Sequence, residues 1–335
     1  MSRSVASVSI AARAVINMHS LNNEGREGNI TQTRKASIIA DGRLSPVNVI
    51  SGDTFKHSQV QHLFELAREQ QLPLCEGCQH LDANRINADQ KWIEEMPAVN
   101  AHVVSSLLGH CVIDDLAGNL ITTGGRSLPR KGIVEFGWVI GIPPLVQTKD
   151  YFHIKFALND QTRNDSQEHP SEANGANLGQ MIFHRPASCG VYALVCHLEL
   201  ARIGYNELIQ EYAIDQKQRA VRAAVALQSV LHTFLETKGA MRSTQLPHLV
   251  SLEGVISASR SGAIPAPFIA PEAGGHEQPT FYREQIHSIA KALNGKAGEV
   301  VTCEDFETVA DFAQCMRTLI DEAVPAELPA DRLSK

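Results

Sequence analysis

The sequence SVSIAARAVINMHSLNNEGREGN, residues 7–29, changes character halfway along and decides the predicted fold. Polar and apolar residues alternate through its first half, a pattern that predicts a strand with one buried face. From His19 onward the chain is polar and contains Gly25 and Gly28. A strand that runs into such a loop brings imidazole, hydroxyl and amide groups to one edge of a sheet, where they suit a phosphate or sugar backbone. A plain turn rich in asparagine and glycine explains the same residues.

The composition is that of an ordinary soluble protein, with 43% hydrophobic and 20% charged residues in a chain of 335. This length allows one large domain with insertions or two domains. No apolar run reaches the roughly 18 residues of a membrane span, so no membrane partner is expected. The start of the chain is too short and polar for a secretory signal, so the seven cysteines are expected to be reduced thiols in a cytoplasmic protein.

The net charge of −7 argues against nucleic-acid binding over the whole surface, but the charge is unevenly distributed. Residues 1–60 carry seven basic and four acidic side chains, and residues 214–262 carry six and three. Residues 263–335 carry six basic and twelve acidic side chains. A local basic surface is therefore compatible with the acidic total.

The segment from 35 to 71 predicts a hairpin followed by a helix. Asp41-Gly42 separates two short extended runs, as in a tight hairpin, and Ser51 or Asp53 is suited to begin a helix. Lys56 and His57 would lie in its first turn, where the helix dipole disfavours a cation unless an anion binds the free N–H groups. They are therefore candidates for a phosphate contact, and a solvated lysine and histidine are the alternative.

Residues 72–148 show little periodicity and are interpreted as an insertion. Within it, Cys75 and Cys78 form a C-x-x-C knuckle that can present two thiolates to one zinc ion. The residues that could complete the ligand set are His80, His102, His110 and Cys111. Because there is no second C-x-x-C, the motif is half of a signature and favours two cysteines without metal, and a structural zinc stays open as the alternative.

A glycine-rich basic loop at residues 122–131 contains Arg126. It lacks the GK[ST] ending of a phosphate-binding nucleotide loop. A generic contact of Arg126 with a phosphate backbone and a plain surface loop both fit it.

The second half of the chain predicts strands at 151–158, 180–185, 191–203 and 249–256, and a helix at 214–238 that ends with Gly239 as its C-cap. The polar stretch 159–177 reads as a long loop or the tip of a projecting hairpin. After the Pro/Gly-rich stretch 260–275 the chain is acidic and helix-prone. Without its insertions, the element order approximates β-α-β-β-α-β, the ferredoxin-like or RNA-recognition-motif arrangement, although no RNP aromatic motif is present.

Several motifs taken together point to a known family. They are residues 14–25 (AVINMHSLNNEG) with 28–29, 50–57 (ISGDTFKH), 74–78 (LCEGC) with 84–85, and 238–243 (KGAMRS) followed by Pro247. With them the chain resembles the family-seven CRISPR-associated (Cas) backbone proteins, and among these the autoregulator (DevR-like) branch of type I Cascade effector complexes. The resemblance covers about residues 5–265.

The resemblance implies a hand-shaped α+β fold, with a modified ferredoxin-like, RNA-recognition-motif (RRM) palm at residues 1–71 and 149–265. It implies an inserted fingers domain at 72–148 and a thumb hairpin whose loop is 159–180. The acidic C-terminal region at 266–335 lies outside the resemblance. RNA contacts are implied at the palm edge by His19, Ser20, Asn22 and Asn23, and at the first helix by Lys56 and His57. Further RNA contacts are implied at the thumb base by His184 and Arg185, and beside the palm by Lys238 and Arg242.

The implied function is that of a non-catalytic, guide-RNA (crRNA) binding subunit whose copies line up along the guide as a helical filament and support its pairing with target DNA. The implied partners are crRNA, target DNA, further copies of the chain, and the large, small, family-five and family-six subunits of Cascade. No cofactor is required for this role.

Three alternatives belong to other classes. Related type III subunits cut RNA with an aspartate in the loop after the first strand, but this loop has Asn22-Asn23-Glu24, so only Glu24 could act as a base or metal ligand. A stand-alone nucleic-acid-binding regulator would be expected to have a basic recognition helix, and none is evident. A metal enzyme built on the C-x-x-C region lacks a histidine/carboxylate set such as H-E-x-x-H.

Overall fold

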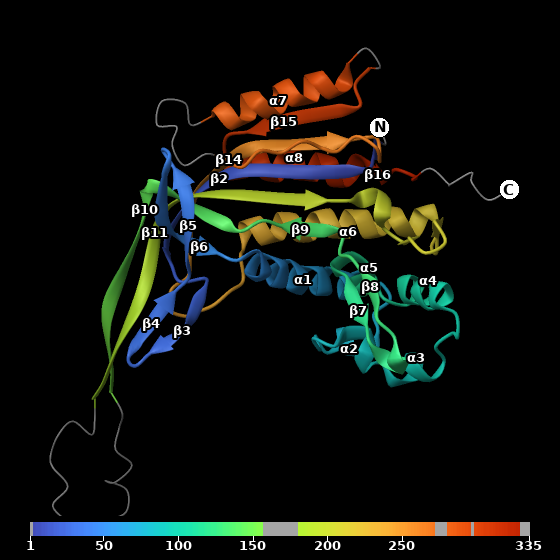
Figure 1. Cartoon of the computed structure of the whole chain (residues 1–335), viewed down its shortest axis with the longest axis horizontal. Helices are drawn as coiled ribbons and strands as arrows, with labels where there is room; N and C mark the ends of the chain where they lie inside the picture. Colours follow the sequence, from blue (N-terminus) through green and yellow to red (C-terminus); the bar gives the residue numbers. More distant parts are fainter. Residues whose placement is uncertain (1–2, 157–179, 272–279, 296–297, 329–335) are drawn as a thin grey trace, which may run out of the picture.

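The computed structural model describes residues 3–156, 180–271, 280–295 and 298–328, and it has a long mixed sheet with helices on both faces (Figure 1). The strands of this sheet are, in spatial order, β15 (Val301–Phe306), β14 (His248–Ser259), β2 (Ser7–His19), β11 (Gln180–Leu198), β10 (Val139–Phe156), β6 (Arg43–Ile50) and β5 (Lys35–Ala40). Beside this row, β4 (Ile30–Thr33) and β9 (Val134–Phe136) pair with β11, and β3 (Asn23–Glu27) pairs with β4. The longer helices are α1 (Gly52–Glu69), α4 (Asn100–His110), α6 (Gln216–Leu235), α7 (Phe281–Asn294) and α8 (Val309–Glu322).

The predicted first strand is confirmed as β2, but it is buried on both faces and not on one. Val8, Ile10 and Ala12 lie in the main hydrophobic core with residues of α1, α6 and α8. Ala11, on the other face, packs against α7. The hydroxyl of Ser9, on the same face as Ala11, donates to the carbonyl of Ala266 at 2.9 Å. The C-terminal part of the chain therefore covers the face that the local pattern left open.

Local signals set the start of both central helices. The Ser51 hydroxyl accepts the N–H of Thr54 at the start of α1, as expected. Asp215 begins α6 with a capping box, and this helix packs beside α1. Its predicted end at Gly239 is too late, because α6 closes with Glu236 as C-cap and an N–H bond to the carbonyl of His232.

The hairpin at Asp41-Gly42 is confirmed. Strands β5 and β6 pair antiparallel across it, and the two turn residues have φ angles of 51° and 70°. Positive φ at both central positions is what a type I′ turn requires and what an Asp-Gly pair tolerates.

A lobe beneath α1 is built from short elements between residues 76 and 130 (Figure 1). In chain order these are α2 (Glu76–Gln79), η1 (Arg85–Ala88), α3 (Gln90–Glu94), α4, α5 (Val112–Ala117), β7 (Asn119–Ile121), η2 (Thr123–Gly125) and β8 (Leu128–Arg130). The predicted insertion extended to residue 148, but residues 134–136 and 139–148 belong to strands β9 and β10 of the main sheet.

The region after residue 266 is not only helical, as its composition suggested. Besides α7 and α8 it contributes strand β15, which pairs antiparallel with β14 at the edge of the sheet. A further strand, β16 (Ala323–Pro325), pairs in parallel with β1 (Arg3–Val5). Val301 and Phe306 are buried while the acidic residues between them face outward, so tertiary packing stabilises a strand in an acidic segment.

A long antiparallel hairpin of β10 and β11 projects away from the sheet (Figure 1). Its pairing continues to Phe156 and Gln180. The predicted thumb loop 159–180 lies outside the described residues except for Gln180. Three short elements after β11 lead toward α6, namely η4 (Leu200–Arg202), β12 (Tyr205–Asn206) and β13 (Glu211–Tyr212).

Candidate nucleic-acid interface

A shallow groove of about 680 Å³ runs between the loop after β2, the first turns of α1 and the segment that follows α6. Its lining residues are Leu21, Asn22, Asn23, Asp53, Thr54, His57, Gln61, Lys238, Gly239, Ala240 and Arg242. Five of the predicted RNA-contacting residues are thus brought together from three separate parts of the chain, namely Asn22, Asn23, His57, Lys238 and Arg242.

Asn22 fixes the loop against the start of α1. Its side-chain oxygen accepts hydrogen bonds from the hydroxyls of Thr54 at 3.2 Å and Ser51 at 3.5 Å. Its side-chain nitrogen is buried and has no hydrogen-bond partner among the described residues. A buried amide donor without a partner is costly, so the groove retains an unused donor next to the N-terminus of a helix.

The two cations of the groove form ion pairs with exposed acids. The Lys238 ammonium lies 2.7 Å from Glu65, and the Arg242 guanidinium lies 2.8 Å from Glu236, whose pKa it lowers through this hydrogen bond. The side chains of both glutamates are more than half exposed. Surface pairs of this kind contribute about 0–1 kcal/mol, so both cations can exchange their partners for phosphate at little cost.

Lys56 and His57 were predicted together, and the structure separates them. His57 is exposed and lines the groove. Lys56 is half-buried on the side of α1 that faces the lobe, where a Cβ built on Gly132 would lie 2.8 Å from its ammonium. Burial and the nearby Arg85 lower the pKa of Lys56. The reason is helical geometry, since consecutive residues point about 100° apart.

His19 and Ser20, which were predicted with Asn22 and Asn23 at the palm edge, are buried and do not line the groove. The Nε2–H of His19 donates to the hydroxyl of Tyr192 at 2.8 Å, because that hydroxyl in turn donates to Asn48. Burial lowers the pKa of His19 to about 4. The Ser20 hydroxyl donates to the side-chain oxygen of Asn23 at 2.9 Å. Both residues therefore stabilise the loop through buried hydrogen bonds.

His184, Arg185 and Arg126 lie outside the residues that line the groove. The ring of His184 packs edge-on against Phe152 across the β10–β11 hairpin. Arg185 lies over Phe183 and donates to the hydroxyl of Thr244, which ties the hairpin base to the segment after α6. Arg126 is in the lobe and donates to two backbone carbonyls there.

Sequence reasoning did not identify Asp53, Thr54 or Gln61 as groove residues. A signal for two of them was present, because Asp53, His57 and Gln61 are spaced four residues apart and therefore share one face of α1. Asp53 is the one acidic side chain among the residues that line the groove.

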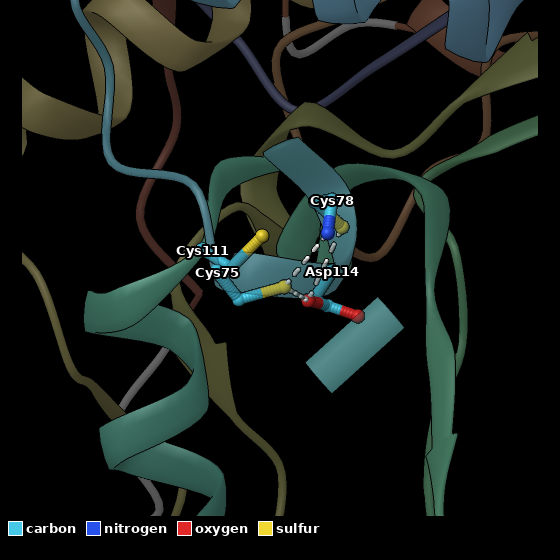
Figure 2. A group of neighbouring side chains, drawn as sticks. All are labelled: Cys75, Cys78, Cys111 and Asp114. Atoms are coloured by element: carbon cyan, nitrogen blue, oxygen red, sulfur yellow. Dashed lines mark hydrogen bonds between the residues drawn. The ribbon is translucent and has the colours of Figure 1, made fainter. Parts of the chain in front are cut away.

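The predicted cysteine pair lies in a second polar cluster inside the lobe (Figure 2). Cys75 and Cys78 meet Cys111, one of the residues considered as a completing ligand, and Asp114, which was not considered. All four are buried, and their donor atoms lie within 4.8 Å of one another. We call these four residues the cysteine–aspartate cluster.

The three histidines considered as further ligands, His80, His102 and His110, are not part of this cluster. His110 instead hydrogen-bonds Asp89 at 3.0 Å. The missed residue had a signal, because Cys111-x-x-Asp114 repeats the spacing of Cys75-x-x-Cys78.

A family model described as "CRISPR-associated negative auto-regulator DevR/Csa2" matches residues 10–277 of the chain. Two curated proteins of Saccharolobus solfataricus are similar to it along most of their length. "CRISPR-associated protein Cas7/Csa2 1" is 21% identical over 305 residues, which cover 86% of this chain and 89% of that protein. "CRISPR-associated aCascade subunit Cas7/Csa2 2" is 22% identical over an alignment of 344 positions, which covers 96% of this chain and 99% of that protein.

Among solved structures, a chain of a "CRISPR RNA-guided surveillance complex, pre-nicking" is similar with a TM-score of 0.49 and 11% identity, covering 93% of this chain and 99% of the other. Separately, no described helix is long and apolar enough to cross a membrane.

Proposed function

The chain belongs to the CRISPR-associated DevR/Csa2 family, and from this membership together with the groove we propose that it is a crRNA-binding backbone subunit of a type I Cascade surveillance complex. Several copies would bind successive segments of one guide RNA and support its pairing with target DNA. The names of the curated relatives, one of which is called an aCascade subunit, support this role.

The observation that carries the proposal is the composition of the groove. Lys238, Arg242 and His57 meet the amides of Asn22 and Asn23 beside the start of α1. Cations, amide donors and a helix N-terminus are the groups that bind phosphates without reading bases. Such a surface suits a subunit that must accept every guide sequence, because base pairing supplies the specificity.

The covered sheet also favours binding at the loop edge. An RRM that stacks bases on aromatic side chains needs an open sheet face. Here α7 packs on that face, and Ser9 and Ser257 donate to backbone carbonyls of Ala266 and Pro267. We therefore infer that the RNA backbone follows the loop edge and the groove and does not lie across the sheet.

We propose the family's hand-like organisation for this chain. The elements β2, α1, β10, β11, α6 and β14 follow the order β-α-β-β-α-β, and the four strands are arranged as β14–β2–β11–β10. This order supports an RRM-like palm. The lobe beneath α1 would be the fingers, and the β10–β11 hairpin would be the thumb.

The thumb is also the surface that we propose for contact with target duplex and neighbouring subunits, including the next copy. Phe152, Ile154 and Ile182 on this hairpin are each more than 40% exposed. Apolar side chains gathered on a projecting element indicate an interaction surface.

We propose a non-catalytic role in the cytoplasm that needs no cofactor for RNA binding. Glu24, which directly follows Asn22 and Asn23, accepts a hydrogen bond from the guanidinium of Arg34 at 2.8 Å. Because this carboxylate is engaged by a guanidinium and, among the described residues, is not hydrogen-bonded to a group that it could deprotonate, we infer that the loop carries no ribonuclease chemistry.

The first test is to express the chain alone, measure its mass and ultraviolet absorbance ratio, and size any nucleic acid extracted from it. We expect RNA of mixed sequence in particles whose masses increase in regular steps. A nucleic-acid-free monomer that ignores added RNA at low salt would overturn the proposal.

The second test is quantitative. Arg242→Ala should weaken binding of unrelated guide sequences alike and reduce the slope of log affinity against log salt by about one. Arg317→Ala is the matched control, because Arg317 is also a surface arginine paired with an acid but lies on α8, away from the groove. Equal losses in both variants, or a loss for one guide only, would contradict a phosphate-binding groove.

A further inference from the structure

The cysteine–aspartate cluster is made from two short motifs of identical spacing (Figure 2). Cys75 and Cys78 lie at the start and inside of α2, and the Sγ of Cys75 accepts the N–H of Cys78 at 3.4 Å. Cys111 directly precedes α5, and Asp114 lies within α5. Two separate segments of the lobe thus present two donor atoms each to one point.

Glycine makes the first motif possible. A Cβ on Gly77, between the two cysteines, would lie 2.1 Å from the carbonyl oxygen of Arg85. This is far inside van der Waals contact, so the turn that aims both sulfurs at Asp114 requires glycine at this position.

The distances fit a tetrahedral metal ion. With Zn–S near 2.3 Å and Zn–O near 2.0–2.2 Å, a tetrahedron places two sulfurs about 3.8 Å apart and sulfur and oxygen about 3.5 Å apart. The Oδ2 of Asp114 lies 3.3 Å from the Sγ of Cys75 and 3.7 Å from the Sγ of Cys78. A small adjustment of the longest separation, which is below 4.8 Å, suffices to bring all four donors into one coordination sphere.

The surroundings of Asp114 also favour the binding of a cation. Its side chain is fully buried, and its Oδ1 has no hydrogen-bond partner among the described residues. The next residue, Asp115, is equally buried but lies 2.7 Å from guanidinium nitrogens of both Arg130 and Arg222. A buried carboxylate is stable only when its charge is compensated. Two arginines compensate the charge of Asp115, whereas Asp114 is surrounded by the sulfur atoms of three cysteines.

We propose that Cys75, Cys78, Cys111 and Asp114 bind one structural Zn²⁺ ion that joins α2 to α5. Three thiolates and one carboxylate fill a tetrahedral site and leave no position for water, so the site is structural and not catalytic. Sulfur ligands also favour zinc over magnesium or calcium. None of its four ligands is among the residues that line the groove.

The ion would stabilise the lobe where it meets the groove helix. Helix α5 packs against α1, and Cys78 and Ile113 line a cavity of about 310 Å³ together with His57. Loss of the ion is therefore expected to loosen the lobe first, because the short helix α2 buries little apolar surface of its own.

The test measures zinc in the full chain, purified without a metal-affinity tag under reducing conditions. We expect about one zinc per chain in the wild type and in Cys196→Ser, and less than about a tenth of that in Cys111→Ser. Cys196 is a matched control, because it is a buried cysteine outside the cluster. A zinc-free wild type that takes up none from added zinc, or zinc that survives Cys111→Ser, would overturn the proposal.

A second variant covers the case in which Cys111→Ser does not fold. Asp114→Cys converts the site to four cysteines and should still bind one metal per chain. After replacement of zinc by Co²⁺, the sulfur-to-metal charge-transfer absorbance should rise by about one third, from three thiolates to four. An unchanged absorbance would exclude Asp114 from the site.

Thiol titration of the unfolded wild-type protein should find all seven cysteines as free thiols. A disulfide between Cys75 and Cys78 would contradict the zinc site.

Discussion

The groove and the cysteine–aspartate cluster are both polar sites assembled from distant parts of the chain, but they balance charge differently. In the groove, Lys238 and Arg242 are paired with glutamates that are more than half exposed. In the cluster, all four donors are buried, and one oxygen of Asp114 has no hydrogen-bond partner within the part of the chain that the structure describes. Solvent can balance charge in the first site, so its partners can change when a polyanion binds. In the second site, solvent cannot reach the charge of Asp114, so groups inside the protein must compensate it and its partners are fixed.

Substitution of Asp115 should have the largest effect on the free energy of unfolding, because its charge is buried and compensated by buried arginines. Asp115→Ala leaves the buried guanidinium of Arg222 without its carboxylate partner and leaves that of Arg130 with the partly exposed Glu207. We expect a loss of about 3–5 kcal/mol in the free energy of unfolding, measured by denaturant titration. Glu207→Ala is the matched control, since Glu207 also pairs with Arg130 but is 42% exposed. Its loss should stay within about 1 kcal/mol, and similar losses in both variants would remove the distinction between buried and exposed charge.

His19 tests whether a residue beneath the groove behaves like the buried cluster. Its pKa is lowered to about 4 in the folded protein, against about 6.5 when unfolded. The unfolded chain therefore binds more protons between these values, so the stabilisation is complete above pH 6.5 and is lost as the pH falls toward 4. The loss should reach about 3 kcal/mol, with a slope of about 1.4 kcal/mol per pH unit. His19→Gln should remove this component from the dependence of unfolding free energy on pH, and a variant with an unchanged slope would place the titration elsewhere.

Lys238 and Glu65 should show the smallest effect on stability. Because Glu65 is 62% exposed, the coupling energy of Lys238→Ala with Glu65→Ala in a double-mutant cycle should be below about 1 kcal/mol. Lys238→Ala should nevertheless weaken RNA binding, whereas Glu65→Ala should not weaken it, because it frees the ammonium. A large coupling energy would show that the groove holds its cations as rigidly as the cluster holds its aspartate.

Much of the fold was predictable from short stretches of sequence. Alternation predicted β2, Asp41-Gly42 predicted the β5–β6 hairpin, and Ser51 predicted the start of α1. The strand β15 was missed, because its residues form a strand only by pairing with β14. Of the candidate site, the loop after β2 and the cations after α6 were predicted, but their union in one groove depends on the packing of α1 beside α6.

The sequence by itself determined the local elements and the residue types that carry charge, because alternation, capping and turn chemistry act within a few neighbouring residues. Only the tertiary structure decided which of those residues are exposed. It buried His19 against Tyr192 and covered Ser9 with the backbone of Ala266. It also brought Asp114 to the cysteines. The exposure of these residues depends on partners that are tens to hundreds of positions away in the sequence. The free energy of a buried polar group depends on the groups that surround it in the folded protein.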